Sequence, residues 1–101
     1  MTVIQGRFEW DSKKNEINIK KHGFSFEEIL SVFDDPHFIE RADLEHSTIE
    51  EERFIGFGNI NGLVIVATIF IERDRIRIIS SRLATKKEEA FYYEQQKNFD
   101  S

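Results

Sequence analysis

The chain has no cysteine and only one proline among its 101 residues. Without cysteine it can form neither a disulfide nor a thiolate metal site, and it has no cysteine nucleophile. A domain of this length buries a modest share of its surface, so its stability must come from packing alone. The absence of cysteine also fits a reducing compartment.

Long apolar runs are missing as well. The longest, Leu63–Ile71, is far shorter than the roughly 20 residues of a membrane-spanning helix. The first ten residues contain no apolar stretch suited to a signal peptide. We therefore expect a soluble, cytoplasmic protein that does not engage a membrane and that folds as a single domain over residues 1–101.

Two common kinds of site find no support in the sequence. Gly56 and Gly58 lie within a predicted strand, not between a strand and a helix, so they do not form a phosphate-binding loop. The three histidines, His22, His37 and His46, lack the spacing of metal ligands. We expect no metal and no cofactor.

The net charge of −5 is concentrated in one stretch. Between Glu40 and Glu52 there are six acidic residues and one basic residue, Arg41, which together account for the whole net charge. Such a run is typical of a solvated loop. Alternatively, it binds a basic segment of a partner or holds arginine side chains in place.

Two helices are predicted in the first third of the chain. Asp11 is a suitable N-cap for a helix over Ser12–His22, and Gly23 can adopt the left-handed conformation that ends it. Ser25 and Glu28 form a capping box for a second helix. The apolar side chains of this second helix follow helical spacing on one face: they are Phe26, Ile29, Leu30 and Phe33.

The remaining elements are mostly strands. Phe8–Trp10 and His37–Glu40 are short candidates, and three longer strands follow at Arg53–Gly58, Leu63–Ile71 and Arg75–Ser81. Asn61-Gly62 predicts a hairpin turn, and the apolar run that follows it predicts a central strand. A capping box at Thr85 and Glu88 begins a last helix that ends near Gln96. The order predicts an α+β fold in which two N-terminal helices and a C-terminal helix pack on an antiparallel sheet.

Two groups of basic residues are candidates for chemistry on a phosphodiester. Lys21 and His22 end the first helix, where they either match the helix dipole or transfer protons and neutralise charge. Arg75, Arg77 and Arg82, with Lys86 nearby, either bind phosphate or form a solvated face paired with the acidic stretch, and Arg53 can join either arrangement. Side chains alternate between the two faces of a strand, and Arg77 and Arg82 are an odd number of residues apart. They can therefore face one site only if the strand ends or bulges near Ser80-Ser81.

Several blocks of the sequence resemble the BrnT family of toxins in order and spacing. The opening blocks are Phe8-Glu9-Trp10-Asp11, Lys14, Asn18 and Lys21-His22-Gly23. The middle blocks are Phe26-Glu27-Glu28, Phe33, Asp35-Pro36, Glu52-Arg53-Phe54 and Gly58. The closing blocks are Ile76 to Arg82, Ala84 and Glu88. The resemblance covers nearly the whole chain.

This resemblance implies a RelE-like fold and a metal-independent ribonuclease that arrests translation. It also implies a partner, a BrnA-like ribbon-helix-helix antitoxin. The complex would bind operator DNA only through this antitoxin. By resemblance, the basic positions of the family map to Lys21, His22, Arg53, Arg77 and Arg82. We expect catalytic roles for His22, Lys21, Arg77 and Arg82, and RNA phosphate contacts from Lys14, Arg53, Arg75 and Lys86.

A second hypothesis is a catalytically inactive RelE-like domain that serves as antitoxin partner or co-repressor. The acidic balance of the chain and the lack of a clear acid–base pair favour it. The two hypotheses differ in whether the protein cleaves RNA.

Overall fold

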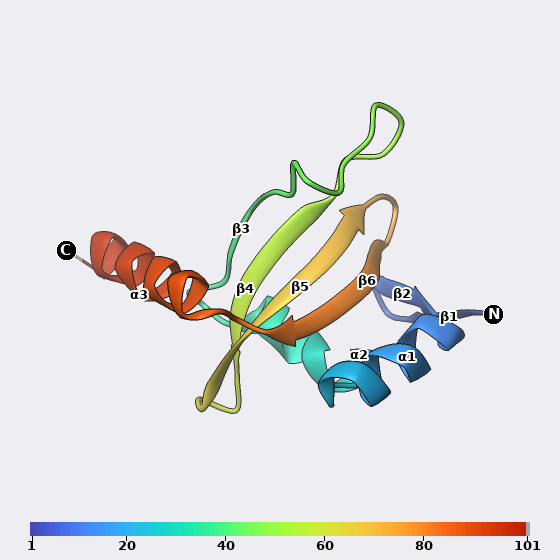
Figure 1. Cartoon of the computed structure of the whole chain (residues 1–101), viewed down its shortest axis with the longest axis horizontal. Helices are drawn as coiled ribbons and strands as arrows, with labels where there is room; N and C mark the ends of the chain where they lie inside the picture. The colour runs from blue at the N-terminus through green and yellow to red at the C-terminus, as the bar shows by residue number, and fades with distance from the viewer. Residues whose placement is uncertain (101) are drawn as a thin grey trace.

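One six-stranded sheet forms the body of the protein (Figure 1). The computed structural model describes residues 1–100, the last three by their backbone only. The elements are β1 (Thr2–Gln5), β2 (Phe8–Asp11), α1 (Ser12–His22), α2 (Phe26–Ile29), the 3-10 helix η1 (Leu30–Asp34), β3 (Ile39–Ala42), β4 (Phe54–Ile60), β5 (Val64–Glu72), β6 (Ile76–Leu83) and α3 (Lys86–Asp100).

The sheet is mixed, with the strand order β1-β2-β6-β5-β4-β3. β2 runs parallel to β6, with Phe8 beside Ile76 and Trp10 beside Ile78, and the other neighbours are antiparallel. The prediction of an antiparallel sheet is therefore wrong at the β2–β6 pair. That pair joins segments separated by all the intervening elements, so no turn signal in the sequence announces its direction. β1 was not predicted; it pairs with β2 as a hairpin at the edge of the sheet.

The meander at the centre of the sheet confirms the predicted strands. β5 lies between β4 and β6 and is buried along most of its length, as its apolar run indicates. Asn61 and Gly62 both have positive φ, +56° and +72°, which is the geometry of the predicted two-residue hairpin turn. No helix in the described part of the chain is both long and apolar enough to cross a membrane.

The larger hydrophobic core lies between one face of the sheet and α2 with η1. Its buried members are Phe8, Trp10, Phe26, Ile29, Val32, Ile60, Val66, Phe70 and Ile78. The second predicted helix is shorter than expected, since it changes to 3-10 geometry at Leu30. Gly58 permits the close approach of η1 to β4: a Cβ there would lie 2.7 Å from Cβ of Val32 and 2.8 Å from its carbonyl oxygen.

α1 is held mainly by polar contacts, and its predicted limits are confirmed. Asp11 caps it by accepting from the Lys14 N–H at 3.2 Å, and Gly23 ends it at φ 78°. Asn18 is the buried residue of the helix. Its amide oxygen accepts from the Ser81 N–H at 3.0 Å and its amide nitrogen donates to the Phe24 carbonyl at 2.9 Å. Asn18 thus joins α1 to β6.

α3 covers part of the opposite face of the sheet over a smaller apolar cluster that contains Phe57, Ala67 and Tyr92. The helix continues to Asp100, beyond the predicted end near Gln96. The Tyr92 hydroxyl donates to the Asp35 carboxylate at 2.6 Å, and the same carboxylate accepts from the Asn59 N–H at 2.8 Å. Asp35 therefore ties α3 to β4 and to the segment after η1.

Candidate active site

A bulge in β6 decides which side chains share a face of the sheet. Ile78 pairs with Phe70 and Ser80 pairs with Ile69, so Ile79 is an extra residue without a register partner. The extra residue shifts the alternation of side chains by one position. Arg77 and Arg82, which would otherwise point to opposite faces, therefore lie on the same face of the sheet. The sequence required a bulge near Ser80-Ser81 for Arg77 and Arg82 to face one site, and the structure has this bulge at Ile79.

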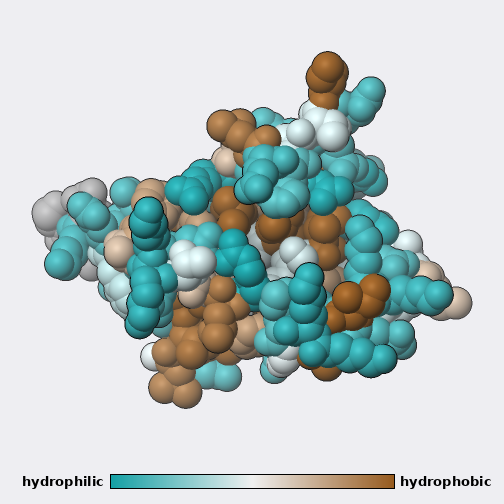
Figure 2. All heavy atoms as spheres, viewed as in Figure 1, coloured by the Kyte–Doolittle hydropathy of each residue, from teal (hydrophilic) through white to brown (hydrophobic). Residues whose placement is uncertain are grey.

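A groove of about 400 Å³ opens on this face beside α1. It is lined by Lys14, Ile17, Asn18, Lys21, His22, His46, Ile69, Ile79, Ser80 and Arg82. Isoleucines supply its apolar part, and lysine, histidine and arginine side chains surround them. Figure 2 looks onto this side of the molecule and shows apolar atoms in a hollow between hydrophilic side chains.

The helix spacing of α1 explains three of these side chains. Lys14, Asn18 and Lys21 follow one another at helical intervals, so they share one face of α1. His22 follows at the last turn, and all of them except the buried Asn18 are exposed. The groove therefore combines the predicted Lys21–His22 pair with Lys14 and Arg82.

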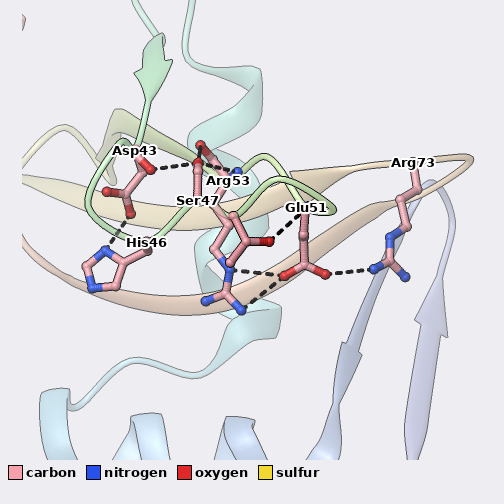
Figure 3. Close-up of polar contacts among 7 residues, drawn as sticks. Asp43, His46, Ser47, Glu51, Arg53 and Arg73 are labelled. Atoms are coloured by element: carbon pink, nitrogen blue, oxygen red, sulfur yellow. Dashed lines mark hydrogen bonds and ion pairs between the residues drawn. The ribbon is translucent and has the colours of Figure 1, made fainter.

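The segment between β3 and β4 contributes His46 to the groove. Hydrogen bonds join the start and the end of this segment (Figure 3). The Asp43 N–H donates to the Arg53 carbonyl at 2.8 Å. The Ser47 hydroxyl donates to the Asp43 carbonyl at 2.7 Å and accepts from the Arg53 N–H at 2.9 Å. These bonds hold the start and end of the segment together and fix the position of His46 between them.

His46 forms a dyad with Asp43. Its Nδ1 lies 2.8 Å from the Asp43 carboxylate, which is only 9% exposed, whereas the imidazole is 50% exposed and lines the groove. Glu45 brings a third ligand-type atom within 4.8 Å of these two groups. Glu45 and His46 are exposed, and Nδ1 is already hydrogen-bonded to Asp43, so the arrangement is a hydrogen-bonded dyad beside an exposed acid.

Arg82 is held in the groove by the first turn of α3. Its guanidinium donates to both carboxylate oxygens of Glu88, at 2.7 and 3.0 Å, and to the Leu83 carbonyl at 3.2 Å. The hydrogen bonds to Glu88 raise the pKa of Arg82, and the same bonds lower the pKa of Glu88. A guanidinium has five N–H donors, so Arg82 keeps donors for a phosphate.

The other predicted residues lie outside this groove. Arg77 is paired with Glu9 on the neighbouring strand β2. Arg53 donates to Glu51, which also pairs with Arg73 at 3.0 Å, so one carboxylate of the acidic stretch holds two arginines in place. Arg75 is exposed in the turn before β6.

Lys86 is fully exposed at the start of α3, 3.8 Å from Glu89. The structure thus brings Lys14, Lys21, His22 and Arg82 together and does not bring Arg53, Arg75, Arg77 or Lys86 to the same groove.

The sequence reasoning missed two residues of the groove. His46 was considered only as a metal ligand and set aside for its spacing. The signal for the dyad was present in Asp43 and His46, three residues apart in a polar loop, but loop geometry was needed to use it. Asn18 was named among the blocks that resemble the BrnT family, and its hydrogen bond from the Ser81 N–H is a long-range contact.

The groove combines cationic side chains, which can contact a phosphate, with two imidazoles, which can transfer protons. Over residues 10–88 the chain matches the profile of a family described as ribonuclease toxin, BrnT, of type II toxin-antitoxin systems. The chain belongs to this family, as its sequence blocks indicated.

One solved structure supports the same assignment. The 1.1 Å crystal structure of the ribonuclease toxin BrnT from Brucella abortus is similar to this chain, with a TM-score of 0.56 and 30% sequence identity. The match covers 76% of this chain and 94% of that one. No curated protein sequence matches the chain.

Proposed function

We propose that this protein cleaves RNA in the groove between α1, β6 and the β3–β4 segment, and thereby arrests translation. The observation that carries the proposal is the convergence of Lys14, Lys21, His22 and Arg82 on one groove of about 400 Å³. Membership of a ribonuclease toxin family supports the reaction, and the lining of the groove supports its location. The RelE-like fold implied by the resemblance is part of the same proposal.

The proposed reaction is transesterification that needs no metal. The RNA 2′-oxygen attacks the adjacent phosphorus and the 5′-oxygen leaves, so the site must move two protons and stabilise a doubly charged phosphorane. Arg82 from β6 and Lys21 from α1 supply positive charge to the groove. His22 or Lys21 can transfer a proton. Arg77 remains a proposed phosphate contact further along the same face.

The proposed partner is a BrnA-like ribbon-helix-helix antitoxin that neutralises the enzyme and carries the complex to operator DNA. The family assignment supports an antitoxin partner in general. A purified mixture with such an antitoxin should form a stable complex in which RNA cleavage is suppressed. Growth arrest should be relieved on co-expression.

The test is RNA cleavage by the purified protein in excess EDTA, together with growth on induced expression. Arg82→Ala should lower cleavage by about 100-fold or more, since it removes a donor aimed at the developing charge. Arg7→Ala is the matched control: Arg7 is exposed, does not line the groove and lies 3.8 Å from Asp34. It should cleave RNA and arrest growth like the wild type.

The alternative, an inactive binding module, is favoured by one observation. Both oxygens of Glu88 already engage Arg82. This hypothesis predicts soluble wild-type protein that binds the antitoxin, cleaves no RNA and leaves growth unaffected. That result would replace the ribonuclease proposal.

A further inference from the structure

The β3–β4 segment brings an imidazole to the groove that no sequence motif assigns. His46 lines the groove together with Lys14, Lys21 and His22 of α1, which are cationic or titratable. Arg82 lines the same groove from β6, and the exposed Glu45 lies beside the dyad. The pKa of Arg82 is raised mainly by its hydrogen bond to Glu88, and the negative charge of Asp43 adds to this effect.

The hydrogen bond between Asp43 and His46 fixes the chemistry of the imidazole. A carboxylate only accepts hydrogen bonds, so the Nδ1 atom of His46 must carry the proton in the 2.8 Å contact. In the neutral ring, Nε2 is then the unprotonated nitrogen. Because Nδ1 is used by Asp43, Nε2 is the atom available to accept a proton from a ligand in the groove.

The dyad is held rigidly compared with an ordinary surface histidine. Asp43 is buried, and its backbone is bonded at both N–H and C=O, to Arg53 and to Ser47. The Ser47 hydroxyl is bonded in turn to the end of the same segment at Arg53. A loop serving only to connect two strands does not require a buried carboxylate behind an exposed imidazole.

We propose that His46 is a catalytic base of this enzyme and that Asp43 is its positioning residue. The inference rests on the proposed RNA cleavage and names a group for one of its two proton transfers. Nε2 of His46 takes the proton of the 2′-hydroxyl as the 2′-oxygen bonds to phosphorus. The bond from phosphorus to the 5′-oxygen breaks, and that oxygen takes a proton from His22 or Lys21 across the groove. The products are a 2′,3′-cyclic phosphate and a 5′-hydroxyl.

The first test compares His46→Gln with the wild type in kcat/KM on a single-stranded oligonucleotide that contains one ribonucleotide. Loss of a general base should lower kcat/KM by on the order of 10²–10⁴-fold. The ascending limb of the pH profile should disappear, and KM should change little. His37→Gln is the matched control, because the recorded bond of His37 to Asp35 uses its backbone N–H and its ring does not line the groove.

Asp43→Asn tests the positioning role. The amide can donate to Nδ1, so the neutral ring should change to the tautomer protonated on Nε2. Heteronuclear NMR of the imidazole nitrogens should show Nδ1–H in the wild type and Nε2–H in the variant. We expect kcat to fall roughly 10-fold or more with KM unchanged. This NMR readout does not depend on activity, and a purely structural role for Asp43 would not move it in this way.

The outcomes separate the inference from the function on which it rests. If the wild type cleaves the oligonucleotide and His46→Gln cleaves it within about 3-fold of that rate, the inference is overturned and the ribonuclease function stands. If the wild type cleaves nothing, both are overturned. If EDTA abolishes cleavage and a divalent cation restores it, a metal-bound role for this group replaces the base. Cleavage of the matching all-deoxy oligonucleotide would overturn the 2′-hydroxyl step.

Discussion

The guanidinium of Arg82 on β6 is clamped by the carboxylate of Glu88 on α3 through two hydrogen bonds of 2.7 and 3.0 Å. The same carboxylate accepts from the Thr85 N–H at 2.8 Å, which completes the capping box of the helix. One side chain thus begins α3 and sets the direction of the arginine in the groove. The position of α3 and the geometry of the site are linked through this contact.

Glu88→Gln should separate these two roles. Glutamine keeps an oxygen that accepts from Thr85, so α3 should still begin at the same place, but the charge that holds Arg82 is lost. We expect kcat for RNA cleavage to fall about 10-fold because the guanidinium is less fixed. KM should stay level or fall, since the negative charge paired with Arg82 has been removed. A rise in kcat would show instead that Glu88 competes with the substrate for Arg82.

Asn18 makes a second link between an element and the groove. Asn18→Ala removes the partner of the Ser81 N–H and of the Phe24 carbonyl, both of which Asn18 satisfies from a buried position. A buried group left without a partner costs about 1–3 kcal/mol, so we expect the free energy of unfolding to fall by at least about 2 kcal/mol. Urea titration measures it.

The control for this change is Glu16→Ala on the exposed face of the same helix. It carries the same alanine substitution without a buried partner and should leave the free energy of unfolding within about 0.5 kcal/mol of wild type. If both variants unfold at the same urea concentration, the contact of Asn18 with β6 contributes nothing measurable. α1 would then be held by its caps and by its flanking segments.

Asp35 should make stability depend on pH. Burial by itself would raise the pKa of its carboxyl, but hydrogen bonds from Tyr92 and from the backbone N–H groups of His37 and Asn59 lower it below 3.8. A carboxyl with a lowered folded-state pKa stabilises the fold above its unfolded pKa, near 3.8. That contribution is lost as the pH falls through the folded value. The window therefore lies on the acid side of 3.8.

Tyr92→Phe isolates one of these bonds. At neutral pH we expect it to lower the free energy of unfolding by about 1.5 kcal/mol, the value of a hydrogen bond to a charged group. The difference from wild type should shrink below pH 3.8, where Asp35 becomes protonated. Urea unfolding across this range measures it, and Tyr93→Phe on the adjacent exposed ring is the control. A difference that stays constant with pH would mean that the bond does not involve the charged carboxyl.

Local signals predicted most of the elements, whereas the direction of the β2–β6 pair depends on a long-range contact. The caps at Asp11 and Ser25 and the turn at Asn61-Gly62 depend on neighbouring residues, and the structure confirms each of them. The pairing of β2 with β6 joins segments that are distant in the sequence, and no local pattern encodes its direction. The edge strand β1 is different, because it forms a local hairpin with β2 across Gly6-Arg7 that the sequence analysis did not predict.

The candidate site shows the same division. Lys14, Lys21 and His22 could be grouped from helical spacing because all lie on one helix. The position of Arg82 on the same face as Arg77 required a bulge that the residues themselves do not specify. His46 reaches the groove on a loop whose ends are joined by Ser47 and Arg53, and the sequence does not indicate these hydrogen bonds.

Arg77 allows a last comparison, because its ion-pair partner Glu9 can be changed separately. If Arg77 contacts RNA phosphate as proposed, Arg77→Gln should weaken RNA binding and make it less dependent on salt. One phosphate contact to a single strand contributes about 0.7 to the slope of log K against log salt, so the slope should fall by about that amount. Binding titrations at several salt concentrations measure it.

Glu9→Gln breaks the same pair but keeps the arginine charge, so it should preserve the salt slope and bind RNA at least as tightly as the wild type. Both variants should lose similar stability, since Arg77 and Glu9 are 24% and 18% exposed and the pair is screened only in part. Equal weakening of RNA binding by both changes would mean that the ion pair supports binding by stabilising the β2–β6 pairing, and not by a contact of Arg77 with phosphate. Only the arginine change should alter the slope if Arg77 touches the phosphate.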